Sequence, residues 1–130
     1  MATPNELVAV SREGDVVTLT MTFAPYNLVG RPLLTAVMDA VDKAHKEAAR
    51  AIVLRSGLRH FSAGAEIELF DNQGERLPEI DVCACLDALE QVPVPIIASM
   101  HGLALGGGFE LALACDIIVA ADSSKEAWLK

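Results

Sequence analysis

The amino-acid sequence predicts a single domain of the α/β class, and three observations support this. Apolar patterns with the periods of a strand and of a helix alternate along the chain, which favours a sheet with right-handed crossover connections. The 130 residues are 52% hydrophobic and 22% charged, a composition typical of a globular domain with one core. No internal repeat, low-complexity run or linker marks a second domain.

The first third of the chain predicts a hairpin followed by a helix. Residues 7–12 and 16–23 have the apolar patterns of strands and flank a turn at 13–15. From Pro32 to residue 48, apolar residues recur at helical spacing, and a proline suits the first turn of a helix. Polar residues on the other side of this helix are expected to face solvent.

The remaining elements continue the alternation. Residues 51–54 predict a short buried strand, and the polar residues 71–78 predict a loop that could admit a ligand. Residues 80–90 predict a helix, which Pro93 and Pro95 end before a buried strand over 96–100. A helix beginning near residue 107 and a strand over 116–121 complete the pattern.

The most informative segment is PIIASMHGLALGGGFE, residues 95–110. Its glycines Gly106, Gly107 and Gly108 stand between strand-like and helix-like residues, where a helix N-terminus is expected. The first N–H groups of a helix have no partner within it, so they suit an oxygen that carries or develops negative charge. The spacing fits neither a P-loop nor a dinucleotide motif, which argues against a nucleotide phosphate held in that way.

This segment resembles the glycine loop and helix of the crotonase (enoyl-CoA hydratase/isomerase) family. A second segment, FSAGAEI at residues 61–67, is similar to that family's F-S-A-G-A-D. The two motifs occur in the family's order and with family-like spacing. The resemblance implies a crotonase-like superhelix of ββα units that is truncated at the C-terminal side. Residues 1–124 would be the N-terminal part of that domain, and residues 125–130 a divergent C-terminal tail.

The resemblance also implies a site. The backbone N–H groups of Ala65 and Gly107 match an oxyanion hole for the carbonyl oxygen of a coenzyme A thioester, and Glu110 matches a catalytic glutamate. Such donors stabilise the enolate-like oxygen that forms when water or a proton adds at the double bond of an acyl thioester. The neighbouring positions implied to bind substrate are Ala63, Gly64, Gly106 and Gly108.

The implied reaction is hydration of a trans-2-enoyl-CoA, with coenzyme A as part of the substrate and no separate cofactor. Double-bond isomerisation by one base and a non-catalytic acyl-CoA-binding or subunit-interaction role are the alternatives. Two departures from the family bear on this choice. Glu66 stands where the family has Asp, and the register places Lys130 where hydratases carry a second catalytic glutamate.

Simpler interpretations exist for each of these residues. A carboxylate such as Glu110 in a first helical turn is favourable through the helix dipole or a capping box alone. Three glycines can form a flexible connection or a tight turn. Ala65 has no side-chain chemistry, so only the resemblance singles it out.

Charge and residue types exclude several functions. Eighteen acidic residues against ten basic ones give a net charge of −8, which disfavours nucleic acid and anionic membrane surfaces as partners. No apolar run reaches the roughly 18–20 residues needed to cross a bilayer. The cations that could meet coenzyme A phosphates are Arg31, Arg55 and Arg59, for which an ordinary surface role is the alternative.

Three cysteines without a signal-peptide pattern predict a reducing, cytoplasmic location. Neither the cysteines nor the histidines show metal-ligand spacing, so no metal is assigned. His101 is predicted to be a hydrogen-bonded loop histidine rather than a ligand contact. Since the front part of a crotonase would expose apolar surface, we expect a homo-oligomer, by family resemblance a trimer or a dimer of trimers.

Overall fold

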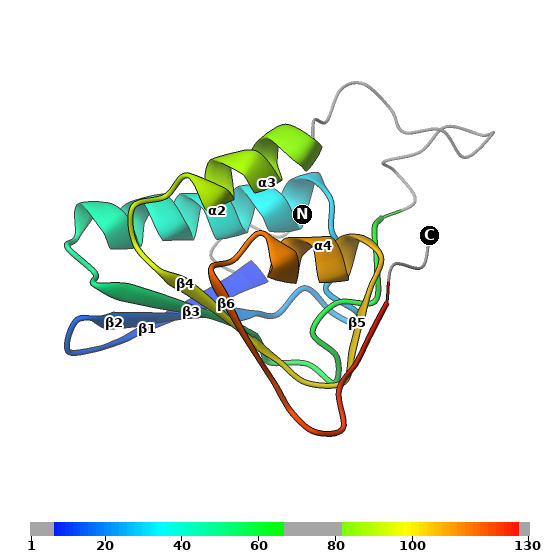
Figure 1. Ribbon diagram of the computed structural model, residues 1–130. Coiled ribbons are helices and arrows are strands. Elements are labelled where there is room, and N and C mark those ends of the chain that lie inside the picture. Colours follow the sequence, from blue (N-terminus) through cyan, green and yellow to red (C-terminus); the bar gives the residue numbers. More distant parts are fainter. Residues whose placement is uncertain (1–6, 67–81, 128–130) are drawn as a thin grey trace.

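The computed structural model describes residues 7–66 and 82–127, which form a sheet with helices packed on one of its faces (Figure 1). In chain order the elements are β1 (Val8–Glu13), β2 (Val16–Met21), α2 (Arg31–Lys46), β3 (Ala51–Ser56), α3 (Val82–Glu90), β4 (Ile96–Met100), β5 (Leu103–Leu105), α4 (Gly107–Leu113), β6 (Ile117–Ala120) and β7 (Lys125–Ala127). The predicted α/β alternation is therefore confirmed over these residues.

The main sheet has five strands in the order β1-β2-β3-β4-β6. Strands β1 and β2 form the predicted antiparallel hairpin, whereas the β2–β3, β3–β4 and β4–β6 pairs are all parallel. Strands β5 and β7 make a separate parallel pair. Parallel strands need crossover connections, and the helices lie in these connections: α2 between β2 and β3, α3 between β3 and β4, and α4 between β4 and β6.

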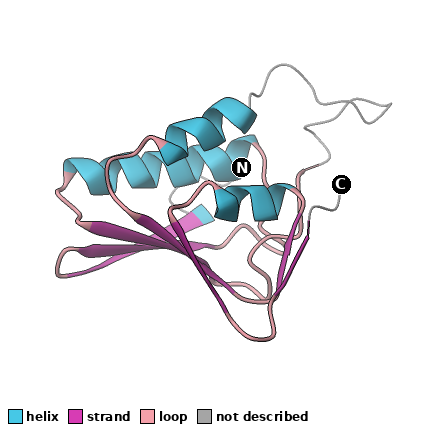
Figure 2. Ribbon diagram, viewed as in Figure 1, coloured by secondary structure: helices cyan, strands magenta, loops and turns pink. Residues whose placement is uncertain are grey.

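Helices α2, α3 and α4 all lie on the same face of the five-stranded sheet (Figure 2). The core lies between this helical layer and the sheet, because alternate residues of each central strand and one side of α2 point into it. Its most deeply buried side chains include Leu19, Met21, Leu33, Val37, Val41, Ile52, Leu54 and Ile96.

Two short strands differ from the prediction. Strand β5 lies between β4 and the glycines, so the strand that leads into the helix is β5 and not the predicted one over residues 96–100. With three residues each, β5 and β7 are too short to show a periodic apolar pattern, and their pairing joins distant parts of the chain. The predicted loop over residues 71–78 falls outside the described residues.

The boundary placed after residue 124 stays a prediction. Leu103 pairs with Lys125 in the register of β5 and β7. The first residues of the predicted tail are thus part of a small sheet beside α4.

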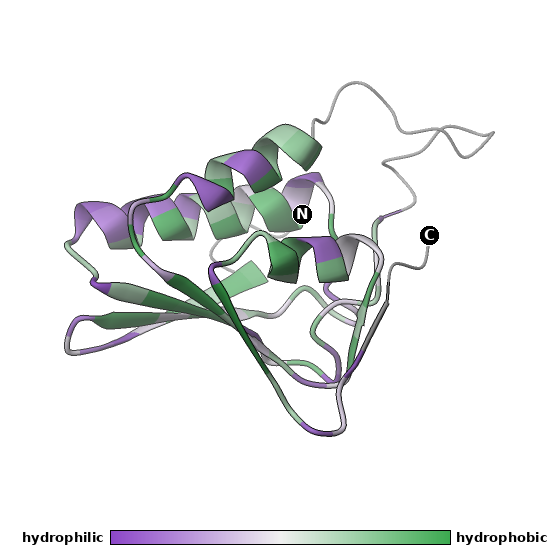
Figure 3. Ribbon diagram, viewed as in Figure 1, coloured by the Kyte–Doolittle hydropathy of each residue, from purple (hydrophilic) through white to green (hydrophobic). Residues whose placement is uncertain are grey.

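Strand β6 forms one edge of the main sheet and is apolar (Figure 3). Ile117, Ile118 and Val119 are 53%, 37% and 57% exposed. Ile117 and Val119 pair with Ile97 and Ser99 on the sheet face that is opposite the helices. The expected exposed apolar surface is therefore present at this edge.

Alanine substitutions at two paired residues, Leu19 and Val10, test where the core lies. Leu19 and Val10 face each other across the β1–β2 ladder, yet Leu19 is fully buried and Val10 is 58% exposed. Leu19→Ala should lower the free energy of unfolding by about 3 kcal/mol through lost burial and a residual cavity. Val10→Ala should cost less than about 1 kcal/mol. Urea denaturation measures both, and equal losses would contradict this placement of the core.

Candidate active site

The two signature segments lie side by side although they are far apart in the sequence. Ser62 N–H donates to the Leu103 carbonyl at 3.1 Å, and Leu105 N–H donates to the Ser62 carbonyl at 3.0 Å. These bonds form a parallel bridge between Ser62 and Ala104. The segment after β3 is thereby attached to β5, immediately before the glycines.

A second bridge holds the same segment from its other side. Val29 N–H donates to the Gly64 carbonyl at 2.7 Å, and Glu66 N–H donates to the Val29 carbonyl at 2.9 Å. Ala65 is the residue that this parallel bridge pairs with Val29, yet its own N–H takes no part in either bond. The bridge therefore fixes Ala65 while leaving its N–H available.

Gly107 is the first residue of α4 and follows the N-cap Gly106, whose φ of 49° is in the region that favours glycine. A Cβ placed on Gly107 would lie 3.6 Å from the Ala65 nitrogen and 3.5 Å from the Ala65 Cβ. The two positions predicted to form an oxyanion hole are thus neighbours. Among residues 7–66 and 82–127, neither N–H has an acceptor.

Gly108 explains how the segments come so close. A Cβ at this buried position would lie 2.5 Å from both Cβ and Oγ of Ser62, which no real contact allows. Glycine is therefore required here by packing, and the interpretation of the three glycines as a flexible connection is wrong. Substrate binding by Ala63, Gly64, Gly106 and Gly108 stays a prediction. Ala63 N–H already donates to the Tyr26 carbonyl at 3.0 Å.

Glu110 is half-buried in the first turn of α4. Within the described part of the chain, no ion pair or hydrogen bond holds its carboxylate. A capping box needs a side chain on the N-cap residue, and Gly106 has none, so that alternative is wrong. The helix-dipole explanation remains open, and the carboxylate is free to hold water or take a proton.

Asn27 is a fully buried polar residue that connects these segments. Its Oδ1 accepts from Phe23 N–H at 2.9 Å, and its Nδ2 donates to Ser56 Oγ at 2.8 Å and to the Phe61 carbonyl at 3.1 Å. Its own carbonyl accepts from Ser62 Oγ at 2.7 Å. The sequence pattern does not single out Asn27 as a functional residue. Its signal was an asparagine in a turn, where its φ of 49° suits Asn better than most residues.

Two histidines add contacts between the same loops. His101 Nε2 lies 2.7 Å from the Leu58 carbonyl, and since a carbonyl only accepts, this nitrogen carries the proton. The prediction of a hydrogen-bonded loop histidine is confirmed. His60 Nδ1 accepts from Leu103 N–H at 3.0 Å, so that nitrogen is unprotonated. Two residues just before the first signature segment, Leu58 and His60, are therefore bonded to residues that follow β4.

The model of the family described as enoyl-CoA hydratase/isomerase matches residues 11–128, which is nearly the whole chain. The chain belongs to the enoyl-CoA hydratase/isomerase family. This confirms the resemblance, and with it a crotonase-like fold for the described residues.

Individual relatives agree in sequence and in structure. The chain is 36% identical over 123 residues to a probable enoyl-CoA hydratase of Bacillus subtilis, covering 91% of this chain and 48% of the relative. It is similar to a structure of enoyl-CoA hydratase subunit I from Geobacillus kaustophilus, with a TM-score of 0.81, 35% identity and coverage of 93% and 48%. It is also similar to a structure of methylmalonyl-CoA decarboxylase complexed with 2S-carboxypropyl-CoA. The TM-score is 0.84 and the identity 25%, and the match covers 98% of this chain and 50% of that one. The chain spans about half the length of these crotonase relatives.

The three arginines named as possible phosphate contacts have different surroundings. The Arg55 guanidinium donates to Thr20 Oγ1 at 3.2 Å on the sheet face away from the helices, which favours its ordinary surface role. Arg31 and Arg59 are exposed, and their role stays open. Burial, with a smaller effect of Asp116, raises the pKa of the Cys115 thiol to about 12, so this cysteine is no nucleophile at neutral pH.

The described residues contain no group of three or more His, Cys, Asp or Glu side chains able to hold a metal ion. None of their helices has both the length and the apolar character needed to cross a bilayer. The cytoplasmic location stays a prediction.

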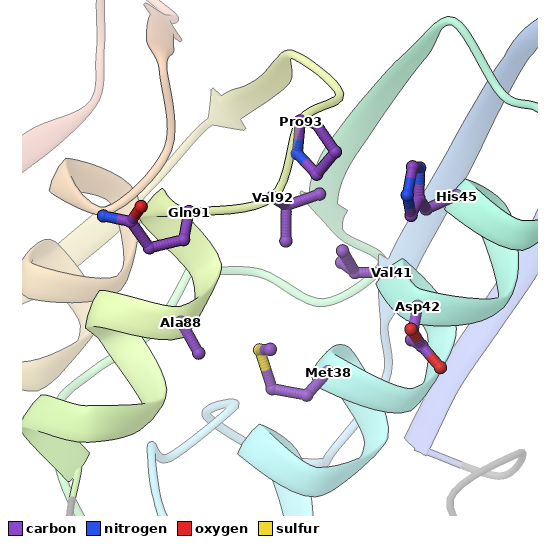
Figure 4. A pocket seen from close by; sticks show the side chains of 8 residues that line it. All are labelled: Met38, Val41, Asp42, His45, Ala88, Gln91, Val92 and Pro93. Atoms are coloured by element: carbon purple, nitrogen blue, oxygen red, sulfur yellow. The ribbon is translucent and has the colours of Figure 1, made fainter.

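A cavity of about 330 Å³ lies between α2 and α3 (Figure 4). It is lined by Met38, Val41, Asp42, His45, Ala88, Gln91, Val92 and Pro93. No residue of either signature segment lines it. Asp42, one of its polar residues, forms an ion pair with Lys46 at 3.0 Å. This cavity is therefore separate from the candidate active site.

Asn27 can be tested without reference to activity. Asn27→Gly accepts the positive φ but loses the side-chain amide, which removes the donor to the buried Phe61 carbonyl. It should lower the free energy of unfolding by about 2–4 kcal/mol. Asn27→Ala loses the same bonds and adds backbone strain of about 1 kcal/mol. Urea denaturation compares the two, and a loss under about 1 kcal/mol for Asn27→Gly would show that the buried amide is dispensable.

Alanine substitutions at the adjacent Gly107 and Gly108 distinguish an effect on packing from an effect on ligand binding. Gly108→Ala should destabilise the fold because its Cβ meets Ser62 at 2.5 Å. Gly107→Ala has only ordinary contacts, at 3.5 Å or more, and should keep or slightly raise stability, because alanine favours helix by about 1 kcal/mol. Its methyl group would nevertheless stand beside the Ala65 N–H and hinder an incoming oxygen. Thermal unfolding and acyl-CoA affinity measure both effects, and a stable Gly108→Ala variant would contradict the packing argument.

Proposed function

We propose that this chain performs acyl-CoA thioester chemistry, specifically the hydration of a trans-2-enoyl-CoA. The observation that carries the proposal is the adjacency of Ala65 and Gly107, whose N–H groups have no acceptor among the described residues. Membership of the enoyl-CoA hydratase/isomerase family supports a thioester carbonyl as the group they receive. The bridges through Val29 and Ser62 hold both donors before substrate arrives.

The chemistry follows from charge. Two N–H donors on the thioester oxygen draw electrons from the conjugated double bond, so its β-carbon accepts a water oxygen and negative charge develops on the thioester oxygen. The α-carbon then receives the proton that the water has lost, which completes the addition of one water molecule. Each donor aimed at such an oxygen is worth about 3–4 kcal/mol of barrier. The Glu110 carboxylate would hold the attacking water and take its proton.

Isomerisation is the second candidate, and one observation favours it. When Glu110 is aligned with one catalytic glutamate of the family, Lys130 is aligned with the second catalytic glutamate. Lys130 lies outside the described residues. A lysine does not replace a carboxylate in holding water. A single base that moves a proton from one carbon to another is enough for double-bond isomerisation. A non-catalytic acyl-CoA-binding role would use the same backbone donors without Glu110.

Substitution of Glu110 distinguishes an enzyme from a binding module. With crotonyl-CoA as substrate, Glu110→Gln should reduce turnover by about 10²- to 10⁴-fold while acyl-CoA binding persists, because general acid–base groups typically contribute that much. The decrease of the thioester absorbance measures turnover. Glu90→Gln, an exposed glutamate at the end of α3, is the matched control and should change nothing. Tight binding without turnover by the unsubstituted chain would contradict the enzymatic proposal and support the binding role.

We also propose that the chain forms a homo-oligomer. The apolar edge strand β6 supports this, since an exposed, apolar edge is a template for association with another chain. A trimer or a dimer of trimers is the arrangement that the family resemblance implies.

Light scattering coupled to size-exclusion chromatography tests the oligomer. The apparent mass should exceed that of a monomer and should fall when Ile117→Lys and Val119→Lys are combined, because charge on β6 opposes apolar contact. Val10→Lys, at a similarly exposed valine in the opposite edge strand β1, is the control. A monomer at every concentration would overturn the proposal.

A further inference from the structure

Helix α2 begins without a side-chain cap of its own. Its N-cap residue is Gly30, no acidic residue lies in its first turn, and the first helical residue is Arg31. The first N–H groups of any helix need acceptors from outside the helix, and a negative group is favourable there. A negative group from another part of the fold would therefore be favourable at this position.

The backbone does not require a glycine at this position. Gly30 has φ −172° and ψ −169°, an extended conformation that any residue adopts. What excludes a side chain is Glu66. A Cβ placed on Gly30 would lie 3.1 Å from each of Cγ, Cδ and Oε1 of Glu66. The carboxyl group of Glu66 thus fills the space into which an N-cap side chain would extend.

The Glu66 side chain is only 9% exposed. Ionisable side chains are almost never this buried unless a favourable partner compensates for lost hydration. The start of α2, with its outward N–H groups, is such a positive environment. The burial of Glu66, its contact with the Gly30 position and its negative charge are therefore all consistent with a carboxyl group placed at the N-terminus of α2.

We infer that Glu66 is a positioning residue, which caps α2 from the oxyanion segment and so fixes the backbone of Ala65. Gly30 and Glu66 act as a pair, since the longer side chain of Glu, compared with Asp in the resembling motif, occupies the room that glycine leaves. Ala65 lies between Gly64 and Glu66, both bonded to Val29, which precedes Gly30. The carboxyl group adds a third attachment to the same point.

The inference rests on the proposed function only in assuming that the Ala65 N–H binds a thioester oxygen. Its structural part concerns stability and the geometry of one amide. Both can be measured without substrate, so the two ideas can fail separately.

Thermal unfolding of a double-mutant cycle tests the pairing. Gly30→Ser should crowd the carboxyl group, and Glu66→Ala should remove the cap, so each should lower Tm by about 3–6 °C. The double variant should recover most of that loss, because serine is itself a good N-cap when the carboxyl group is gone. Strictly additive losses would overturn the pairing. If Gly30→Ser fails to fold, Gly30→Ala replaces it. Gly30→Ala should destabilise the Glu66→Ala variant less than it destabilises the chain that keeps Glu66.

The Ala65 amide reports on positioning. In ¹H–¹⁵N spectra, Glu66→Ala should shift the Ala65 cross-peak clearly more than the control Glu90→Ala, and the double variant should not restore it, since a serine cap does not reach Ala65. An Ala65 peak that moves no more than in the control would overturn the positioning role. A shifted peak in a chain that never turns over crotonyl-CoA would contradict the proposed function while supporting this inference.

Discussion

The buried amide of Asn27 is the interaction on which the arrangement of this site depends. It joins the loop after β2, the end of β3 and the first signature segment through hydrogen bonds of 2.8–3.1 Å, and the backbone carbonyl of Asn27 adds a bond of 2.7 Å from Ser62 Oγ. Hydrogen bonds in such surroundings are costly to lose, because the partners are left unsatisfied and away from water. The apolar core builds the sheet, whereas this polar connection determines where the loops between strands and helices lie.

The proposed oxyanion hole would let an acidic chain hold an electron-rich oxygen without a charged side chain. With a net charge of −8, the protein has few cations to spare, and the two donors of the candidate site are main-chain N–H groups. Such donors are fixed by the fold, so little reorganisation is needed when charge develops. Close packing of Gly108 on Ser62 and the bridge at Val29 supply that rigidity.

Long apolar patterns made most of the fold predictable. The sixteen residues of α2 and the strands of four to six residues carry clear periods, while β5 and β7, with three residues each, carry none. In the site, the glycines and Glu110 were visible from the strand-to-helix pattern. Ala65 was found only through resemblance, because a backbone donor leaves no side-chain signature. Asn27 and the Gly30–Glu66 contact acquire meaning only from neighbours that are distant in sequence.

The sheet topology also determines when the site can exist during folding. Only the β1–β2 hairpin pairs strands that are local in sequence, and the other pairs of the main sheet are parallel and non-local. Chains with such high contact order generally fold more slowly than those with local contacts. Ser62 follows β3 and Ala104 follows β4, so their bridge joins segments that the β3–β4 pair brings to the same edge of the sheet. A chain that has formed only its hairpin has not brought Ala65 and Gly107 together, and a ligand that binds both amides would select molecules whose sheet is complete.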